Sequence, residues 1–78
     1  MTETKTINKN DKTYVVQHDS YFAEVATCVE SGVIYTREAY YQWYGYDNGL
    51  IGKERYTYLS NVNNPNDWIR IEKSLLIK

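Results

Sequence analysis

The sequence has one cysteine, one histidine and one proline among its 78 residues. A single cysteine, Cys28, excludes an internal disulfide and a cysteine-based zinc cluster. Because small secreted domains usually carry several disulfides, we expect a cytoplasmic protein. The longest apolar runs are only a few residues, and the first ten residues lack the apolar core of a signal peptide. We therefore expect no membrane partner.

The sequence also lacks an excess of charge of one sign. Nine basic and ten acidic residues give a net charge of −1. A strongly basic domain would have favoured nucleic acid as the partner, and a strongly acidic one a nucleic-acid mimic. Neither description fits the whole chain. The length is that of one domain and excludes a multidomain enzyme.

Residues that carry out chemistry are few. His18 and Cys28 are formally available as a nucleophile pair, but we interpret Cys28 as a small apolar strand residue and His18 as a turn residue. Gly45, Gly49 and Gly52 lack the pattern of a phosphate-binding loop. The carboxylates do not have the spacing of a calcium loop. We therefore expect a protein that is not an enzyme and needs no cofactor or metal.

Tyrosine is abundant. Nine tyrosines, two tryptophans and one phenylalanine make the chain 15% aromatic. The densest stretch is residues 40–46, which read Tyr-Tyr-Gln-Trp-Tyr-Gly-Tyr. In a strand both faces of this stretch carry large rings, and a short chain does not bury them all.

Two interpretations of this stretch remain open. In one, Trp43 enters the core and the tyrosines form a cross-strand ladder with Tyr56 and Tyr58. In the other, the rings form an exposed patch edged by Lys53 and Arg55, a composition typical of binding hot spots. The second interpretation predicts a partner-binding surface made of Tyr40, Tyr41, Trp43, Tyr44, Tyr46, Lys53, Arg55, Tyr56 and Tyr58.

The first half of the chain predicts an arm followed by strands. Residues 1–11 show no apolar period and are expected to be a flexible N-terminal arm, followed by a single β-rich domain over 12–78. Residues 13–17 and 33–36 are short runs rich in β-branched residues and predict strands. Residues 21–30 also favour a strand, since Val25, Thr27 and Val29 alternate, although a helix capped near Asp19 is the alternative. Residues 30–32 then close a tight turn.

The second half predicts a further hairpin and a final strand. Asp47-Asn48-Gly49 predicts a turn between strands at 37–46 and 50–59. A short helix over 37–44 is the alternative, because Tyr40, Trp43 and Tyr44 have helical spacing. The asparagine-rich residues 60–66 predict a loop, and 68–77 a strand with Ile69 and Ile71 on one side.

The expected fold is therefore mostly β, a small antiparallel sheet or half-closed barrel of about five strands. The alternative is an α+β fold with helices near residues 21–31 and/or 67–77. A chain of this length buries only about 60% of its unfolded surface, so a homodimer is compatible with it.

A protein surface is the partner that such an aromatic patch fits best. Single-stranded nucleic acid is second, with bases stacked on the rings and Lys53, Arg55 and Arg70 meeting phosphates. In its size, its single domain and its aromatic content, the chain is similar to the compact accessory proteins of phages and mobile elements. Those often block a host enzyme, including restriction or CRISPR machinery, by covering a functional surface. We therefore expect a non-enzymatic inhibitor or modulator of a host protein or complex, acting in the host cytosol if phage-encoded.

Overall fold

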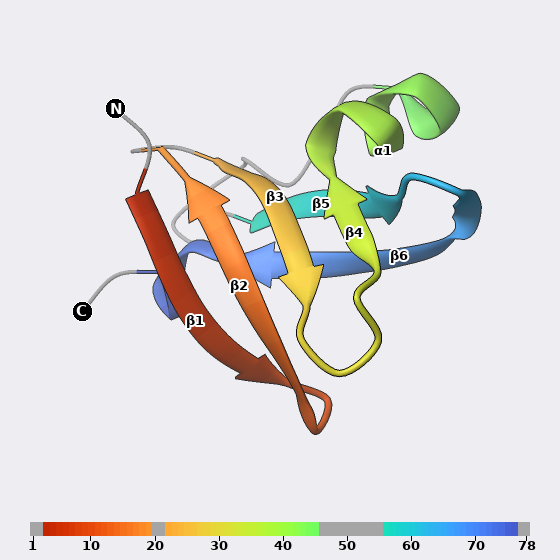
Figure 1. The fold of residues 1–78 in the computed structure, drawn as a ribbon. Helices are drawn as coiled ribbons and strands as arrows, with labels where there is room; N and C mark the ends of the chain where they lie inside the picture. The colour runs from red at the N-terminus through yellow and green to blue at the C-terminus, as the bar shows by residue number, and fades with distance from the viewer. Residues whose placement is uncertain (1–2, 20–21, 46–55, 77–78) are drawn as a thin grey trace.

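The protein folds into one antiparallel sheet with a short helix on its outer side (Figure 1). The computed structural model describes residues 3–19, 22–45 and 56–76. The strands follow one another in the sheet in sequence order, from β1 to β6. Their bounds are Glu3–Lys9 (β1), Lys12–His18 (β2), Ala23–Cys28 (β3), Ile34–Thr36 (β4), Tyr56–Asn61 (β5) and Asn64–Glu72 (β6). Helix α1 spans Arg37–Tyr44, and a single 3₁₀ turn covers Lys73–Leu75. The prediction of a small, mostly β, antiparallel fold is confirmed.

The sheet is strongly coiled, so that its C-terminal half, β5 and β6, crosses behind the strands of its N-terminal half, most clearly behind β3 and β4 (Figure 1). The core lies between these two halves. Leu59 is fully buried, and Ile71 is almost so. The remaining buried apolar residues are Ile7, Tyr14, Val16, Ala23, Ala26, Cys28, Tyr35 and Ile69. Each strand therefore has an inner side facing this core and an outer side facing away from it.

Strand β1 corrects the prediction of a flexible arm over residues 1–11, which is wrong for Glu3–Lys9. All seven residues of β1 pair with β2, from Glu3 opposite His18 to Lys9 opposite Lys12. Ile7 is the one apolar residue of this strand, and it is buried. Asn10 and Asp11 form the turn with φ of 53° and 64°. Asn and Asp tolerate this left-handed backbone, which two-residue hairpins require.

Strand β3 confirms the prediction of a strand rather than a helix within residues 21–30. Its buried side carries Ala26 and Cys28, whereas Val25 and Thr27 lie on the outer side and are only half-buried. The register shifts between Gln17 and His18. The predicted turn at residues 30–32 is present, with Gly32 at φ 75° donating its N–H to the carbonyl of Cys28.

The predicted strand over residues 37–46 is wrong, because residues 37–44 form α1. Thr36 caps this helix, since its hydroxyl accepts a hydrogen bond of 3.0 Å from the N–H of Ala39. Gly45 ends it at φ 80°. The hairpin expected between residues 37–46 and 50–59 is therefore wrong too, and β5 pairs with β4 and β6 instead. The turn predicted at residues 47–49 lies outside the described residues.

The predicted loop over residues 60–66 is also wrong. Strand β5 continues to Asn61, and β6 begins at Asn64. The side-chain carbonyl of Asn61 accepts a hydrogen bond of 2.8 Å from the N–H of Asn63, which closes the two-residue turn. Pro65 is tolerated within β6 because β6 is an edge strand. Residues 64–72 form a strand, and no α-helix occurs among the described residues near 21–31 or 67–76.

Candidate functional site

Five aromatic rings from α1, β5 and β6 pack together on the outer side of the sheet. We call this group the aromatic platform; it consists of Tyr40, Tyr44, Tyr56, Tyr58 and Trp68. Tyr40 stacks on Tyr58 with ring centroids 5.0 Å apart and lies 4.8 Å from Tyr44. Trp68 presents its edge to Tyr58 at 5.5 Å, and Tyr56 does the same at 5.4 Å. Offset-stacked and edge-on pairs of this kind are the favourable arrangements of aromatic rings.

The alternation of the last two strands places these rings outside the core. In β5, Thr57 and Leu59 are buried on the inner side, so Tyr56 and Tyr58 point outward. In β6, Ile69 and Ile71 are buried, so Trp68 and Arg70 point outward. The register sets Tyr58 opposite Arg70. Both strands therefore contribute to one continuous outer surface.

Helix α1 is attached to this surface by its tyrosines. Tyr40 and Tyr44 are four residues apart and therefore share one face of the helix. The hydroxyl of Tyr44 donates a hydrogen bond of 2.6 Å to the carbonyl of Pro65 in β6. No residue of α1 is fully buried. The platform is thus both the contact between helix and sheet and a surface that reaches solvent.

Three large rings of α1 and β6 are open to solvent. Trp43 is 58% exposed, Trp68 47% and Tyr44 46%. The interpretation that places Trp43 in the core is therefore wrong, because α1 turns this residue away from the sheet. The cross-strand ladder of tyrosines is wrong as well, because Tyr40, the ring stacked on Tyr58, comes from a helix and not from a neighbouring strand.

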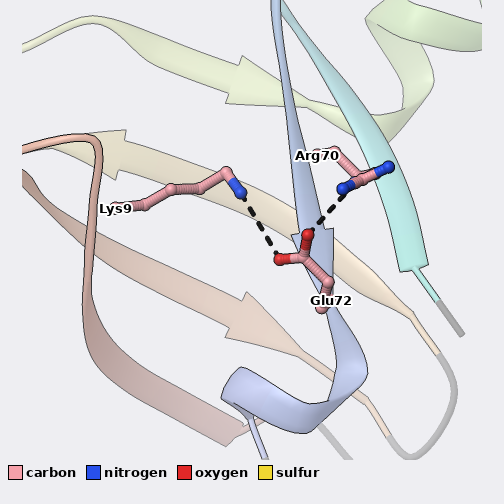
Figure 2. A network of polar contacts seen from close by, with 3 residues as sticks. All are labelled: Lys9, Arg70 and Glu72. Atoms are coloured by element: carbon pink, nitrogen blue, oxygen red, sulfur yellow. Dashed lines mark hydrogen bonds and ion pairs between the residues drawn. The ribbon is translucent and has the colours of Figure 1, made fainter. Parts of the chain in front are cut away.

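A charge network borders the platform (Figure 2). The carboxylate of Glu72 lies between the Nζ of Lys9 at 3.4 Å and the Nε of Arg70 at 3.1 Å. The guanidinium of Arg70 also lies 5.0 Å from the ring centre of Tyr56. A hollow of about 280 Å³ adjoins the network and is lined by Lys9, Asn10, Tyr58, Trp68, Ile69 and Arg70. The surface therefore combines protruding rings with a recess.

The pKa of Glu72 is set by opposing effects. Partial burial raises it, while hydrogen bonding to its own backbone and the charge of Lys9 lower it, as does the hydrogen bond from Arg70. The pKa ends below its ordinary value of 4.5. Glu72 therefore joins the first and last strands of the open sheet as a charged group.

Replacement of Glu72 by glutamine is expected to lower the free energy of unfolding by about 1 kcal/mol at pH 7, the usual size of a partly exposed ion pair. Because the folded-state pKa lies below the unfolded value, this contribution is present above pH 4.5 and is lost as pH falls through the folded-state pKa. Urea unfolding of both proteins between pH 7 and pH 3 measures it. A difference between them that stays constant over this range would contradict the assignment.

The predicted site residues divide into three groups. Tyr40, Tyr44, Tyr56 and Tyr58 come together in the platform, and Trp43 lies exposed on the same helix. Tyr41 belongs to a separate contact, in which the guanidinium of Arg37 lies 4.6 Å from its ring centre and 3.5 Å from that of Phe22. The remaining three, Tyr46, Lys53 and Arg55, lie outside the described residues.

Trp68 was not among the predicted partner-binding residues, although a signal for it was present. The alternation of Ile69 and Ile71 identifies the inner side of the last strand. Once those two residues are placed in the core, Trp68 and Arg70 must point outward, next to any ring on the neighbouring strand. What the alternation does not reveal is that this neighbouring strand is residues 56–61.

The candidate nucleophile pair is separated by the strand register. Cys28 lies opposite Tyr14, whereas His18 lies opposite Ala23. Tyr14 and His18 are four residues apart along β2, which corresponds to about 13 Å. Cys28 instead lies 3.6 Å from the carboxylate of Glu30, to which its thiol donates. In the part of the chain that the structure describes, no group of three or more histidine, cysteine or acidic side chains is placed to hold a metal ion.

Asp67 takes part in a polar contact at the edge of the core. Its carboxylate accepts a hydrogen bond of 3.0 Å from the hydroxyl of Tyr35 and one of 3.1 Å from the side-chain amide of Asn61. Burial, followed by this carboxylate, raises the pKa of Tyr35 well above its ordinary value of 10.0. Burial is also the main cause of a raised pKa at Tyr14, whose ring meets Tyr35 edge-on at 6.1 Å.

The stability of the protein is expected to fall as pH rises above 10. The unfolded chain releases the Tyr35 proton near pH 10, whereas the folded chain retains it, so this contribution is complete below pH 10 and is lost as pH rises toward the folded-state pKa. Tyr35→Phe is expected to flatten this decline and to cost about 1.5 kcal/mol at pH 7 through loss of the bond to Asp67. Urea unfolding at pH 7, 10 and 11 tests both. Equal slopes for the two proteins would contradict the expectation.

Comparison with models of known protein families, with curated proteins and with solved structures finds no match to this chain. Within residues 3–19, 22–45 and 56–76, no helix is long and apolar enough to cross a membrane.

Proposed function

We propose that the protein is a small, non-enzymatic binding module that contacts another protein through the aromatic platform and Trp43. The observation that carries this proposal is that Trp43 and Tyr44 of α1, and Trp68 of β6, the strand to which Tyr44 bonds, are each about half exposed or more. Exposed tryptophan and tyrosine, next to an arginine, form the composition of binding hot spots. Rings of this kind provide contact area at a low cost in side-chain entropy.

A protein partner fits this surface better than single-stranded nucleic acid does. Tyr40 and Tyr58 stack on each other, so a base would have to compete with an existing ring contact. Lys9 and Arg70, the described cations beside the platform, share the carboxylate of Glu72. The whole chain carries a net charge of −1. Phosphate neutralisation, the main driving force for binding nucleic acid strands, therefore has little support here.

The mode of action that we propose is steric. Covering a functional surface of a larger protein requires no chemistry of its own. We therefore propose an inhibitor or modulator of a host protein or complex, of the anti-restriction or anti-CRISPR kind, acting in the cytoplasm. The support for this class is the size of the chain, its single cysteine and its exposed rings.

The test is affinity capture from host lysate, with and without nuclease, followed by mass spectrometry. Wild type is compared with Trp43→Ala and with Val29→Ala, which alters an apolar residue that is equally exposed but lies outside the platform. We expect one dominant protein that survives nuclease and high salt, is retained by Val29→Ala and is lost with Trp43→Ala. Capture that disappears with nuclease would indicate that the surface binds nucleic acid and not a protein. Equal capture by both variants would overturn the proposal.

A further inference from the structure

Strand β1 is an edge strand whose outer residues are uncharged. Thr4, Thr6 and Asn8 have exposed side chains, and they alternate with Glu3, Lys5, Ile7 and Lys9. In Figure 1, β1 forms one end of the sheet, with β2 as its neighbour. An edge strand presents backbone N–H and C=O groups that can pair with another strand. Which residues present them follows from the hairpin geometry.

The outward-facing backbone groups belong to Thr4, Thr6 and Asn8. In a hairpin with a two-residue turn, the residues flanking the turn exchange both of their hydrogen bonds, and these are Lys9 and Lys12. The adjacent carbonyl of Thr13 faces the other way and accepts from the N–H of Val29 at 2.9 Å, which agrees with this assignment. Counting back from Lys9, the backbones of Ile7 and Lys5 face β2. Those of Asn8, Thr6 and Thr4 therefore face the open edge.

We propose that β1 pairs antiparallel with the β1 strand of a second copy of this chain, about a two-fold axis at Thr6. In this register Thr6 lies opposite the second copy's Thr6, and Thr4 lies opposite the second copy's Asn8. All three outward-facing residues then meet outward-facing residues, so six backbone hydrogen bonds form across the axis. The two sheets become one continuous sheet. This inference goes beyond the proposed function and does not depend on it.

Charge selects this register over its neighbours. With the axis at Thr6, Glu3 lies opposite the second copy's Lys9, and Lys5 lies opposite the second copy's Ile7. If the axis is moved to Lys5, Lys5 lies opposite the second copy's Lys5. If the axis is moved to Ile7, Lys5 lies opposite the second copy's Lys9. Like charges directly opposite each other destabilise a strand pair, whereas opposite charges stabilise it. Lysines on an edge usually prevent pairing, but of these three registers, which pair the most outward-facing residues, only the one at Thr6 leaves no like-charge pair.

Matched cysteine variants test the register. In the proposed dimer the Cα atoms of the two Thr6 residues lie about 5.5 Å apart, within the range that a disulfide spans. The two Thr4 residues are offset by about 13 Å along the strand. Under mild oxidation we expect Thr6→Cys to form a covalent dimer at least ~10-fold faster than Thr4→Cys. Native Cys28 is 1% exposed, and the amount of covalent dimer formed by the wild-type protein measures any crosslinking through Cys28. Equal rates for the two variants, or no crosslinking of Thr6→Cys, would overturn the proposal.

Sedimentation equilibrium tests the dimer without a covalent bond. For wild type we expect the mass to rise from 9.2 kDa toward twice that value as concentration increases from about 1 μM to about 1 mM. Thr6→Pro removes an N–H that donates across the axis but none that pairs with β2, so it should remain folded and monomeric. Thr6→Val keeps the N–H and should still dimerise. A monomeric wild type, or a dimer unaffected by Thr6→Pro, would overturn the proposal. If Thr6→Pro fails to fold, the crosslinking rates of Thr6→Cys and Thr4→Cys test the proposal instead.

Discussion

Trp43→Ala is expected to weaken binding of the captured partner about 30-fold, or about 2 kcal/mol, which is the size of a hot-spot residue. The indole is 58% exposed and is held on a helix, so its loss removes contact area without opening the core. The melting temperature should therefore change little. Because the contact is mainly apolar, the loss should also be nearly the same at low and high salt.

The measurement is titration of the purified partner by calorimetry at two salt concentrations, with circular dichroism melting of each variant. Trp68→Ala is expected to weaken binding similarly and also to lower the melting temperature, since Trp68 packs on Tyr58 and Tyr40. Val62→Ala, which alters an exposed residue in the β5–β6 turn, serves as the control. If Trp43→Ala and Trp68→Ala both bind within a factor of two of wild type, neither Trp43 nor the platform is the contact surface. Affinity that falls steeply with salt for every variant would favour phosphate contacts instead.

Leu59→Ala is expected to lower the free energy of unfolding by about 3 kcal/mol, within the 2–5 kcal/mol typical of a buried leucine. Leu59 has no exposed surface and lies in the centre of β5, between the two halves of the coiled sheet. A chain of 78 residues has a total stability on the order of 4–12 kcal/mol. The substitution therefore removes a large share of the stability and leaves a measurable unfolded population.

Urea unfolding followed by tryptophan fluorescence and circular dichroism gives this value. The matched control is Val62→Ala, three residues further along the same hairpin, whose side chain is 49% exposed. We expect that substitution to change stability by less than about 0.5 kcal/mol. A loss below about 1 kcal/mol for Leu59→Ala would mean that the two halves of the sheet are not packed on each other through this residue.

The strands that could be predicted from the sequence are those with a clear local pattern. Residues 13–17 and 33–36 are runs of β-branched and aromatic residues, and Ile69 and Ile71 alternate with charged residues. Strand β1 was not predicted because it contributes only Ile7 to the core, so its pattern resembles that of a polar arm. Residues 60–66 read as a loop because asparagine and proline usually mark turns. The edge position of β6, which tolerates both, is a property of the whole sheet.

The candidate site was predicted in its composition and not in its geometry. Residues 40–44 fit a helical and a strand period equally, since rings occupy nearly every position. The hydrogen bond from Ala39 to Thr36 and the ending at Gly45 favour the helix. The stacking of Tyr40 on Tyr58 joins residues 18 positions apart and depends on where α1 meets β5. No local pattern contains that information.

The attachment of α1 has a consequence for how the protein moves. The helix buries none of its residues completely and rests on the sheet through rings that also face solvent. Local opening requires far less free energy in such an element than in strands that share a buried core. Amide hydrogens of α1 should therefore exchange with solvent long before those of β2 or β5. A partner bound to the platform would slow that exchange, because it would bury the exposed side of α1 and so make local opening of the helix less favourable.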